Sequence, residues 1–118
     1  MQGKKLQETK LWDKDLLLKR VLDNEEIYKA VLLAFVEDMP QLTTKLSEEI
    51  VKQNFIEIAS LAHNMKGSAL NVTANDLSVT ARDIELAAKE QNINQITVLS
   101  RILEEQLSLL LSELSAQL

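Results

Sequence analysis

The sequence predicts an all-α fold, an antiparallel up-and-down four-helix bundle with an additional short N-terminal helix. Apolar residues recur at helical spacing almost throughout, and strict alternation is nearly absent. Good helix formers dominate, whereas 2 Gly and 1 Pro are too few for a turn-rich β fold. The 118 residues, 46% of them hydrophobic, suffice for one domain around a single core. Four long amphipathic segments with short connections are typical of such a bundle.

Capping residues place the first two helices. A short helix is predicted near 12–22, and a long one from about 24 to 52, because Asp23 or Asn24 can serve as its N-cap. Pro40 lies inside the long segment and should kink or interrupt it, since proline has no backbone N–H to donate.

Similar signals place the next two helices. Asn54 can cap a helix over about 55–71, and Asn75 or Asp76 can cap one over about 76–91.

The last helix is predicted from about 94 to 116, after a break at Asn92-Ile93-Asn94. We therefore assign the helical bundle to residues 11–118, and residues 1–10 to a linker or disordered lead-in. One side of the last helix is formed by Leu99, Ile102, Leu103, Gln106, Leu107, Leu110 and Leu114.

Composition and charge exclude several kinds of site. With 0 Cys there is no thiolate metal site or cysteine nucleophile, and 2 Gly cannot form the loops of nucleotide-binding folds. The formal net charge of −5 argues against nucleic acid as a partner, because phosphate neutralisation needs a basic face. A single His excludes a ferritin-like di-iron site, which requires a histidine on each of two helices. No apolar run approaches the ~20 residues that span a bilayer, so we expect a cytoplasmic protein or domain without direct membrane contact.

The only histidine, His63, is predicted to point away from the core. On a helical wheel it lies roughly 140° from the centre of the apolar stripe. Gly67, four residues on, would leave the imidazole unshielded, although a mid-helix Gly costs about 1 kcal/mol relative to Ala. Lys66, three residues on, can present its ammonium group to an anion in the same space. The stripe itself consists of Ile58, Leu61, Ala62, Met65, Ala69 and Val72.

Glu85 and Lys89 lie at one edge of the inward stripe of the next helix, with Arg82 nearby. If the two helices pack together, Glu85 could accept a hydrogen bond from one imidazole nitrogen and leave the other as a nucleophile. The residues alone also allow simpler interpretations. His63 could be an ordinary surface residue, Gly67 could permit close helix packing, and Glu85 and Lys89 could form a surface ion pair.

The segment Ala62–Ala69, AHNMKGSA, resembles the His-x-Leu-Lys-Gly-Ser motif of histidine phosphotransfer (HPt) domains. The resemblance extends from about Trp12 to Leu114. It implies an elongated helical bundle with a phosphorylatable histidine exposed midway along one helix. Further similar stretches are Leu11-Trp12-Asp13, Phe35–Pro40 and Leu86–Lys89.

The resemblance implies a role for each candidate site residue. His63 would carry the phosphoryl group, Lys66 would favour the phosphorylated state, and Gly67 would leave room for the partner's active site. Glu85 would orient the imidazole, and Lys89 would place a further basic group near the site.

Two residues depart from the family pattern. Met65 replaces the usual Leu, a nearly volume-neutral change in the core. Thr73 stands where many members have Gly after an Asn-Leu pair, here Asn71-Val72. The sequence therefore does not settle at which residue this helix ends.

The resemblance implies a phosphorelay intermediate that accepts a phosphoryl group from a receiver-domain aspartate onto His63 and passes it to another receiver aspartate. A neutral imidazole, which predominates at pH 7 with a reference pKa of about 6.5, would be the nucleophile. The chain would have no cofactor of its own, and the response-regulator receiver domain would supply Mg²⁺. We expect a monomer without an ATP site or autonomous kinase activity.

The wider setting of the chain stays open at this point. It could be the C-terminal module of a hybrid sensor histidine kinase, itself anchored in a membrane and covalently linked to this domain. It could also be the phosphorylatable domain of a chemotaxis-type kinase, in which a kinase domain loads His63. In a third alternative the bundle is a silent adaptor, and His63 can be replaced without consequence.

Overall fold

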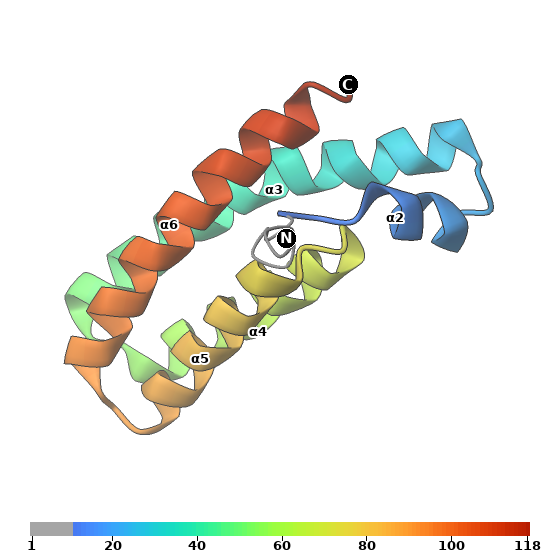
Figure 1. The fold of residues 1–118 in the computed structure, drawn as a ribbon. Coiled ribbons are helices and arrows are strands. Elements are labelled where there is room, and N and C mark those ends of the chain that lie inside the picture. Colours follow the sequence, from blue (N-terminus) through green and yellow to red (C-terminus); the bar gives the residue numbers. More distant parts are fainter. Residues whose placement is uncertain (1–10) are drawn as a thin grey trace, which may run out of the picture.

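The computed structural model describes residues 11–118, and this range is all-helical. The four long helices run alternately up and down in a bundle, and the short helix lies beside the N-terminal half of the first long one (Figure 1). The predicted fold class is therefore confirmed. The lead-in predicted for residues 1–10 lies outside the described residues. The helices are α2 (Lys14–Arg20), α3 (Glu25–Lys52), α4 (Phe55–Asn71), α5 (Asn75–Lys89) and α6 (Ile93–Ser115).

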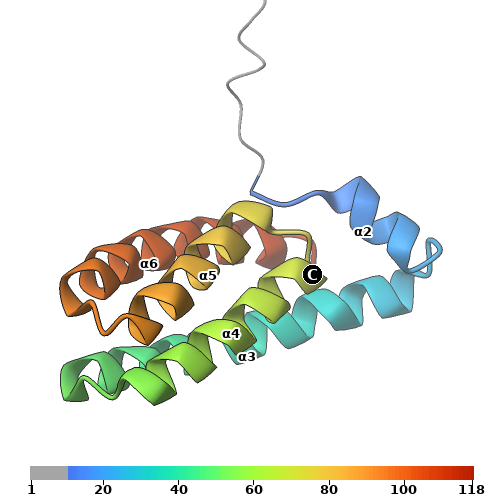
Figure 2. The same ribbon diagram turned by 90° about the horizontal axis from the view of Figure 1, so that it is seen from below.

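A single hydrophobic core fills the inside of the bundle. All six residues of the predicted apolar stripe on α4 are buried, so the helical wheel drawn from the sequence is confirmed. Helices α4 and α5 lie side by side and pack against each other more extensively than any other pair among the described residues (Figure 2). Large side chains fully buried in the other helices include Leu32, Met39, Leu46, Ile84, Leu103 and Leu110. Each stabilises the fold by about 1.5–3 kcal/mol.

Pro40 does not interrupt α3, which is continuous from Glu25 to Lys52. Because proline has no N–H, the carbonyl of Val36 loses its helical donor, which favours a bend. Helix α3 changes direction along its length in Figure 1. The helix is therefore bent but not interrupted, which is the first of the two predicted alternatives.

Asparagine side chains cap three of the long helices. Asn24 accepts a hydrogen bond from the N–H of Ile27 at 3.0 Å. In the same way, the side chains of Asn54 and Asn92 accept a hydrogen bond from the N–H three residues on and cap α4 and α6. The predicted cap of α5 is wrong. Its N-cap is Ala74, which makes no side-chain cap hydrogen bond and is fully buried, so core packing rather than capping selects this residue.

Three predicted boundaries also move inward, at both ends of α2 and at the end of α5. Helix α2 is shorter than 12–22 because Asp13 caps it through the N–H of Leu16, and Leu22 and Asp23 take positive φ angles after its end. Helix α5 ends at Lys89 rather than 91, because Gln91 has a φ of 55°.

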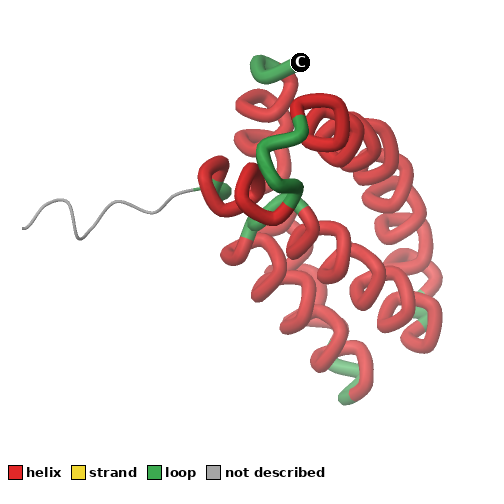
Figure 3. Tube along the Cα trace, turned by 90° about the vertical axis from the view of Figure 1, so that its right-hand side faces the viewer, coloured by secondary structure: helices red, strands yellow, loops and turns green. Residues whose placement is uncertain are grey.

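The turns between the long helices, which lie at the two ends of the bundle in Figure 3, use left-handed residues other than glycine. In each turn, the N–H of the residue after the left-handed one donates a hydrogen bond to the carbonyl five residues before it. Helices that end in this way usually have Gly at the left-handed position. The conformation costs such a residue roughly 1–2 kcal/mol. The residues are Gln53 with φ 53°, Thr73 with φ 60° and Gln91 with φ 55°.

Thr73 shows how α4 ends without the family glycine. The helix stops at Asn71, and the hydroxyl of Thr73 accepts a hydrogen bond from the N–H of Asp13 at 2.7 Å. The same hydroxyl lies 3.0 Å from the carbonyl of Asp13, to which it can donate. These contacts attach the segment before α2 to the turn between α4 and α5. Next to them, Trp12 stacks on Tyr28 with ring centroids 6.5 Å apart.

Candidate functional site

His63 lies near the middle of α4 with its side chain 61% exposed. The core stripe of the helix occupies the opposite side, as predicted. The imidazole is therefore held on a rigid element but remains accessible to a second molecule.

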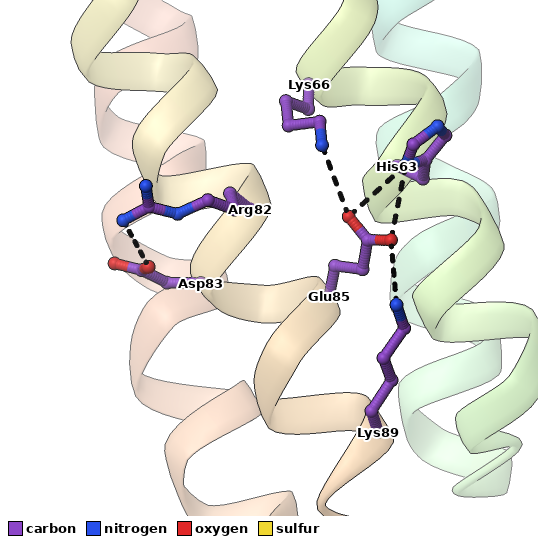
Figure 4. Close-up of polar contacts among 6 residues, drawn as sticks. All are labelled: His63, Lys66, Arg82, Asp83, Glu85 and Lys89. Carbon is purple, nitrogen blue, oxygen red and sulfur yellow. Dashed lines mark hydrogen bonds and ion pairs between the residues drawn. The ribbon is translucent and has the colours of Figure 1, made fainter.

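Glu85 reaches His63 from the neighbouring helix α5 (Figure 4). Its two carboxylate oxygens lie 3.3 Å and 3.2 Å from Nδ1 of the imidazole. An ionised carboxylate can only accept hydrogen bonds, so in the neutral ring the proton lies on Nδ1. The lone pair then lies on Nε2, which none of residues 11–118 contacts by a hydrogen bond. This is the arrangement that a nucleophilic histidine requires.

Lys66 and Lys89 both direct their ammonium groups at Glu85. The Nζ of Lys66 lies 3.7 Å from Oε1, and the Nζ of Lys89 lies 3.4 Å from Oε2. The carboxylate occupies the middle of the group, with His63 and the two lysines around it (Figure 4). The structure thus brings together four of the five predicted site residues in one contact network.

The surroundings of Glu85 keep it ionised. Partial burial would raise its pKa, but the hydrogen bonds and charges of His63 and Lys89 together outweigh this effect and lower the pKa below its ordinary value. With a side chain only 13% exposed, Glu85 is the least accessible member of the network. It is therefore an anion at neutral pH, fixed beside the ring.

Gly67, the fifth predicted residue, makes the surface beside His63 open. A Cβ atom built on Gly67 would meet nothing within 4 Å, so close helix packing does not explain this glycine. The prediction of an unshielded imidazole agrees with this geometry. Arg82, noted from the sequence as nearby, pairs instead with Asp83 at 3.2 Å and takes no part in the network around Glu85.

Two apolar residues flank the site and were not predicted from the sequence. Ile56 lies seven residues before His63 and Leu70 seven residues after it, which places both on the same face of α4. Ile56 is 86% exposed and Leu70 is 43% exposed. The signal was available, because the same helical wheel that put His63 outside puts these two side chains beside it. Exposed apolar groups around a polar centre are typical of a surface that binds another protein.

Within residues 11–118 no group of three His, Cys, Asp or Glu side chains has a metal-holding arrangement. No helix of this range is both long and apolar enough to cross a membrane.

The family model of the Hpt domain matches residues 30–117. The chain belongs to the Hpt domain family. Hpt domains act in histidine phosphotransfer within phosphorelays, where they work with response-regulator receiver domains. The matched range contains His63 and every residue of the network around Glu85, whereas Trp12 and α2 precede it.

Among solved structures, the chain is similar to a rice protein described as a histidine-containing phosphotransfer protein. The TM-score is 0.80, and the match covers 91% of this chain and 79% of the rice chain. Because the sequences are only 15% identical, this likeness supports the Hpt fold and not the role of any residue. No curated protein matches the chain.

Proposed function

We propose that this Hpt domain is a phosphorelay intermediate that accepts a phosphoryl group from a receiver-domain aspartate onto Nε2 of His63 and passes it to another receiver aspartate. One observation carries the proposal: Glu85 holds Nδ1 of an exposed histidine and thereby turns the lone pair of Nε2 towards solvent.

The transfer step follows from this tautomer. The lone pair of Nε2 forms a bond to phosphorus, and the bond between phosphorus and the aspartyl oxygen of the receiver breaks. The electron pair of that bond leaves on the aspartate, and the ring keeps its proton on Nδ1. In the onward step a second aspartate attacks phosphorus, and the electron pair of the N–P bond returns to Nε2. No proton has to move in either direction.

The surface around His63 suits a protein partner with an acidic active site. Ile56 and Leu70 offer apolar contacts on either side of His63, and Gly67 adds no side chain between them. Lys66 and Lys89 bring positive charge to the place where phosphate charge arrives. The receiver domain would supply Mg²⁺ at its own acidic site. We place this exchange between a monomeric domain and receivers in the cytoplasm.

A transfer assay tests the proposal. Receiver domains would be phosphorylated with a small-molecule donor and Mg²⁺, mixed with the full chain, and the chain examined for an acid-labile, alkali-stable phosphate. We expect this label on the wild type and its absence from His63→Gln. Lack of label with every receiver, but label after mixing with a histidine kinase domain and ATP, would instead support the chemotaxis-type alternative. No label from either source would leave a silent adaptor.

A further inference from the structure

One carboxylate connects all the charged groups at the phosphorylation site. Both oxygens of Glu85 contact Nδ1 of His63, while Oε1 also faces Lys66 and Oε2 also faces Lys89. Lys66 comes from α4, and the other two charged residues come from α5.

The remaining charged side chains close to this network do not join it. Arg82 and Asp83 on α5 pair with each other. Within residues 11–118, the charged groups joined to the imidazole are therefore one anion in direct contact, Glu85, and two cations beyond it, Lys66 and Lys89.

We propose that Glu85 keeps the proton on Nδ1 of His63 while Nε2 carries the phosphoryl group, and that Lys66 and Lys89 limit how tightly this proton is held. The proposal rests on the phosphoryl-carrier function proposed above. Glu85 is then a positioning residue for both the ring and its proton, and the two lysines act through it.

Retention of this proton decides whether the phosphoryl group can be passed on. With Nδ1 protonated, breaking the N–P bond returns the electron pair to Nε2 and releases a neutral imidazole. Without that proton, the same step would have to release an imidazolate anion, which is a strong base and a poor leaving group. A phosphohistidine that loses its Nδ1 proton is therefore a store, and one that keeps the proton is a donor.

The charges at the site balance only in the protonated state. A phosphoryl group carries about two negative charges, and Glu85 adds a third. The imidazolium ring, Lys66 and Lys89 supply three positive charges. Loss of the Nδ1 proton would leave an excess negative charge next to the carboxylate of Glu85, which opposes that loss.

The proposal predicts shifts of opposite sign for the anion and the cations. Glu85→Gln keeps an oxygen acceptor for Nδ1 but removes the negative charge, so the proton should be lost about one pH unit lower. Lys66→Gln removes a repelling charge, so the proton should be lost at higher pH. Lys89→Gln should act in the same direction but more weakly, because Lys89 is 62% exposed and Lys66 only 29%.

The experiment uses the full chain phosphorylated with phosphoramidate, which needs no receiver. The ³¹P chemical shift of phosphorylated His63 is followed between about pH 5 and 10, and onward transfer to a receiver is measured over the same range. We expect a lower titration midpoint in Glu85→Gln. As the pH is raised, onward transfer by this variant should begin to fail at a correspondingly lower pH than in the wild type. An unchanged or raised midpoint in that variant would overturn the proposal, as would a lowered midpoint in Lys66→Gln.

Arg82→Gln is the matched control, because it removes a cation from α5 that does not contact Glu85. A shift in this control as large as that in Lys66→Gln would contradict the assignment of the lysines to Glu85. The two proposals fail separately. If His63 takes up no phosphoryl group from phosphoramidate or from any receiver or kinase domain, the carrier function fails and this inference with it. If phosphorylation occurs but the midpoints do not move, only this inference fails.

Discussion

Nδ1 of His63 lies 3.2 Å from Oε2 of Glu85, although the two residues are 22 positions apart in the sequence and belong to different helices. The turn between α4 and α5 and the close packing of these helices bring the two side chains together. The contact leaves Nε2 as the imidazole nitrogen without a hydrogen bond from residues 11–118, so the geometry of the bundle determines the chemistry of its surface.

Replacing His63 should remove phosphoryl acceptance without affecting the fold. The side chain is 61% exposed and makes no core contact, so His63→Gln should change the free energy of unfolding by no more than about 0.5 kcal/mol. Circular dichroism and urea denaturation would measure the helical content and the free energy of unfolding, and the phosphate label would measure phosphoryl acceptance in the same variant. Loss of helical signal in the variant would contradict the position of His63 outside the core.

Gly67→Ala should stabilise the protein by up to about 1 kcal/mol, because Ala is the better helix former and its Cβ meets nothing within 4 Å. Urea denaturation of the two proteins would measure the difference. A destabilised variant would mean that another group occupies the space beside Gly67. The same result would restore helix packing as the reason for this glycine.

Gly67→Glu should block transfer from a receiver domain while leaving the helix intact. The new side chain would fill the open surface beside His63 and place a negative charge where an acidic partner docks. The transfer rate from one phosphorylated receiver would be compared with that from phosphoramidate, a donor too small to be excluded. Equal losses with both donors would show that the variant damages His63 itself rather than access to it.

Local periodicity explains why much of the site could be predicted from the sequence. The apolar stripe of α4 fixes which side of the helix is buried, and the position of His63 and Gly67 opposite it follows from angles alone. The same argument would have placed Ile56 and Leu70 beside His63.

Contacts between helices could not be predicted in this way. The approach of Lys66 to Glu85 depends on how far α5 is shifted along α4, and the periodicity of a single helix does not specify that shift. The pair of Glu85 and Lys89 is different, because it is an i, i+4 contact within α5 that the spacing alone predicts. The cap of α5 was missed for a related reason. Capping preferences favoured Asn75 or Asp76, but the packing of the turn placed Ala74 at that position, inside the core.

Glu85 should make the protein less stable in acid. Burial raises the pKa of Glu85 in the folded state, but the hydrogen bonds and charges of His63 and Lys89 together outweigh burial, so the pKa is lowered. The folded state therefore binds a proton at Glu85 less readily than the unfolded chain does. The resulting stabilisation is complete above the ordinary pKa of 4.5 and disappears as the pH falls through the lowered value.

Urea denaturation between about pH 3 and 6 would measure this effect in the wild type and in Glu85→Gln. The wild type should lose more stability over this range than the variant. Glu90→Gln removes an acid one position after Lys89 but outside the network around Glu85, and serves as the control. Parallel curves for wild type and Glu85→Gln would contradict the lowered pKa.

Thr73 should contribute stability through its hydroxyl rather than its backbone conformation. Thr73→Val keeps a β-branched side chain at a φ of 60° but removes both hydrogen bonds to Asp13, so we expect a loss of about 1–3 kcal/mol. Thr73→Gly removes the same bonds but relieves roughly 1–2 kcal/mol of left-handed strain, so it should be the more stable of the two variants. The fluorescence of Trp12, the only tryptophan, would report release of the adjoining segment in both. If Val proves as stable as the wild type, the contact with Asp13 does not hold the segment before α2 in place.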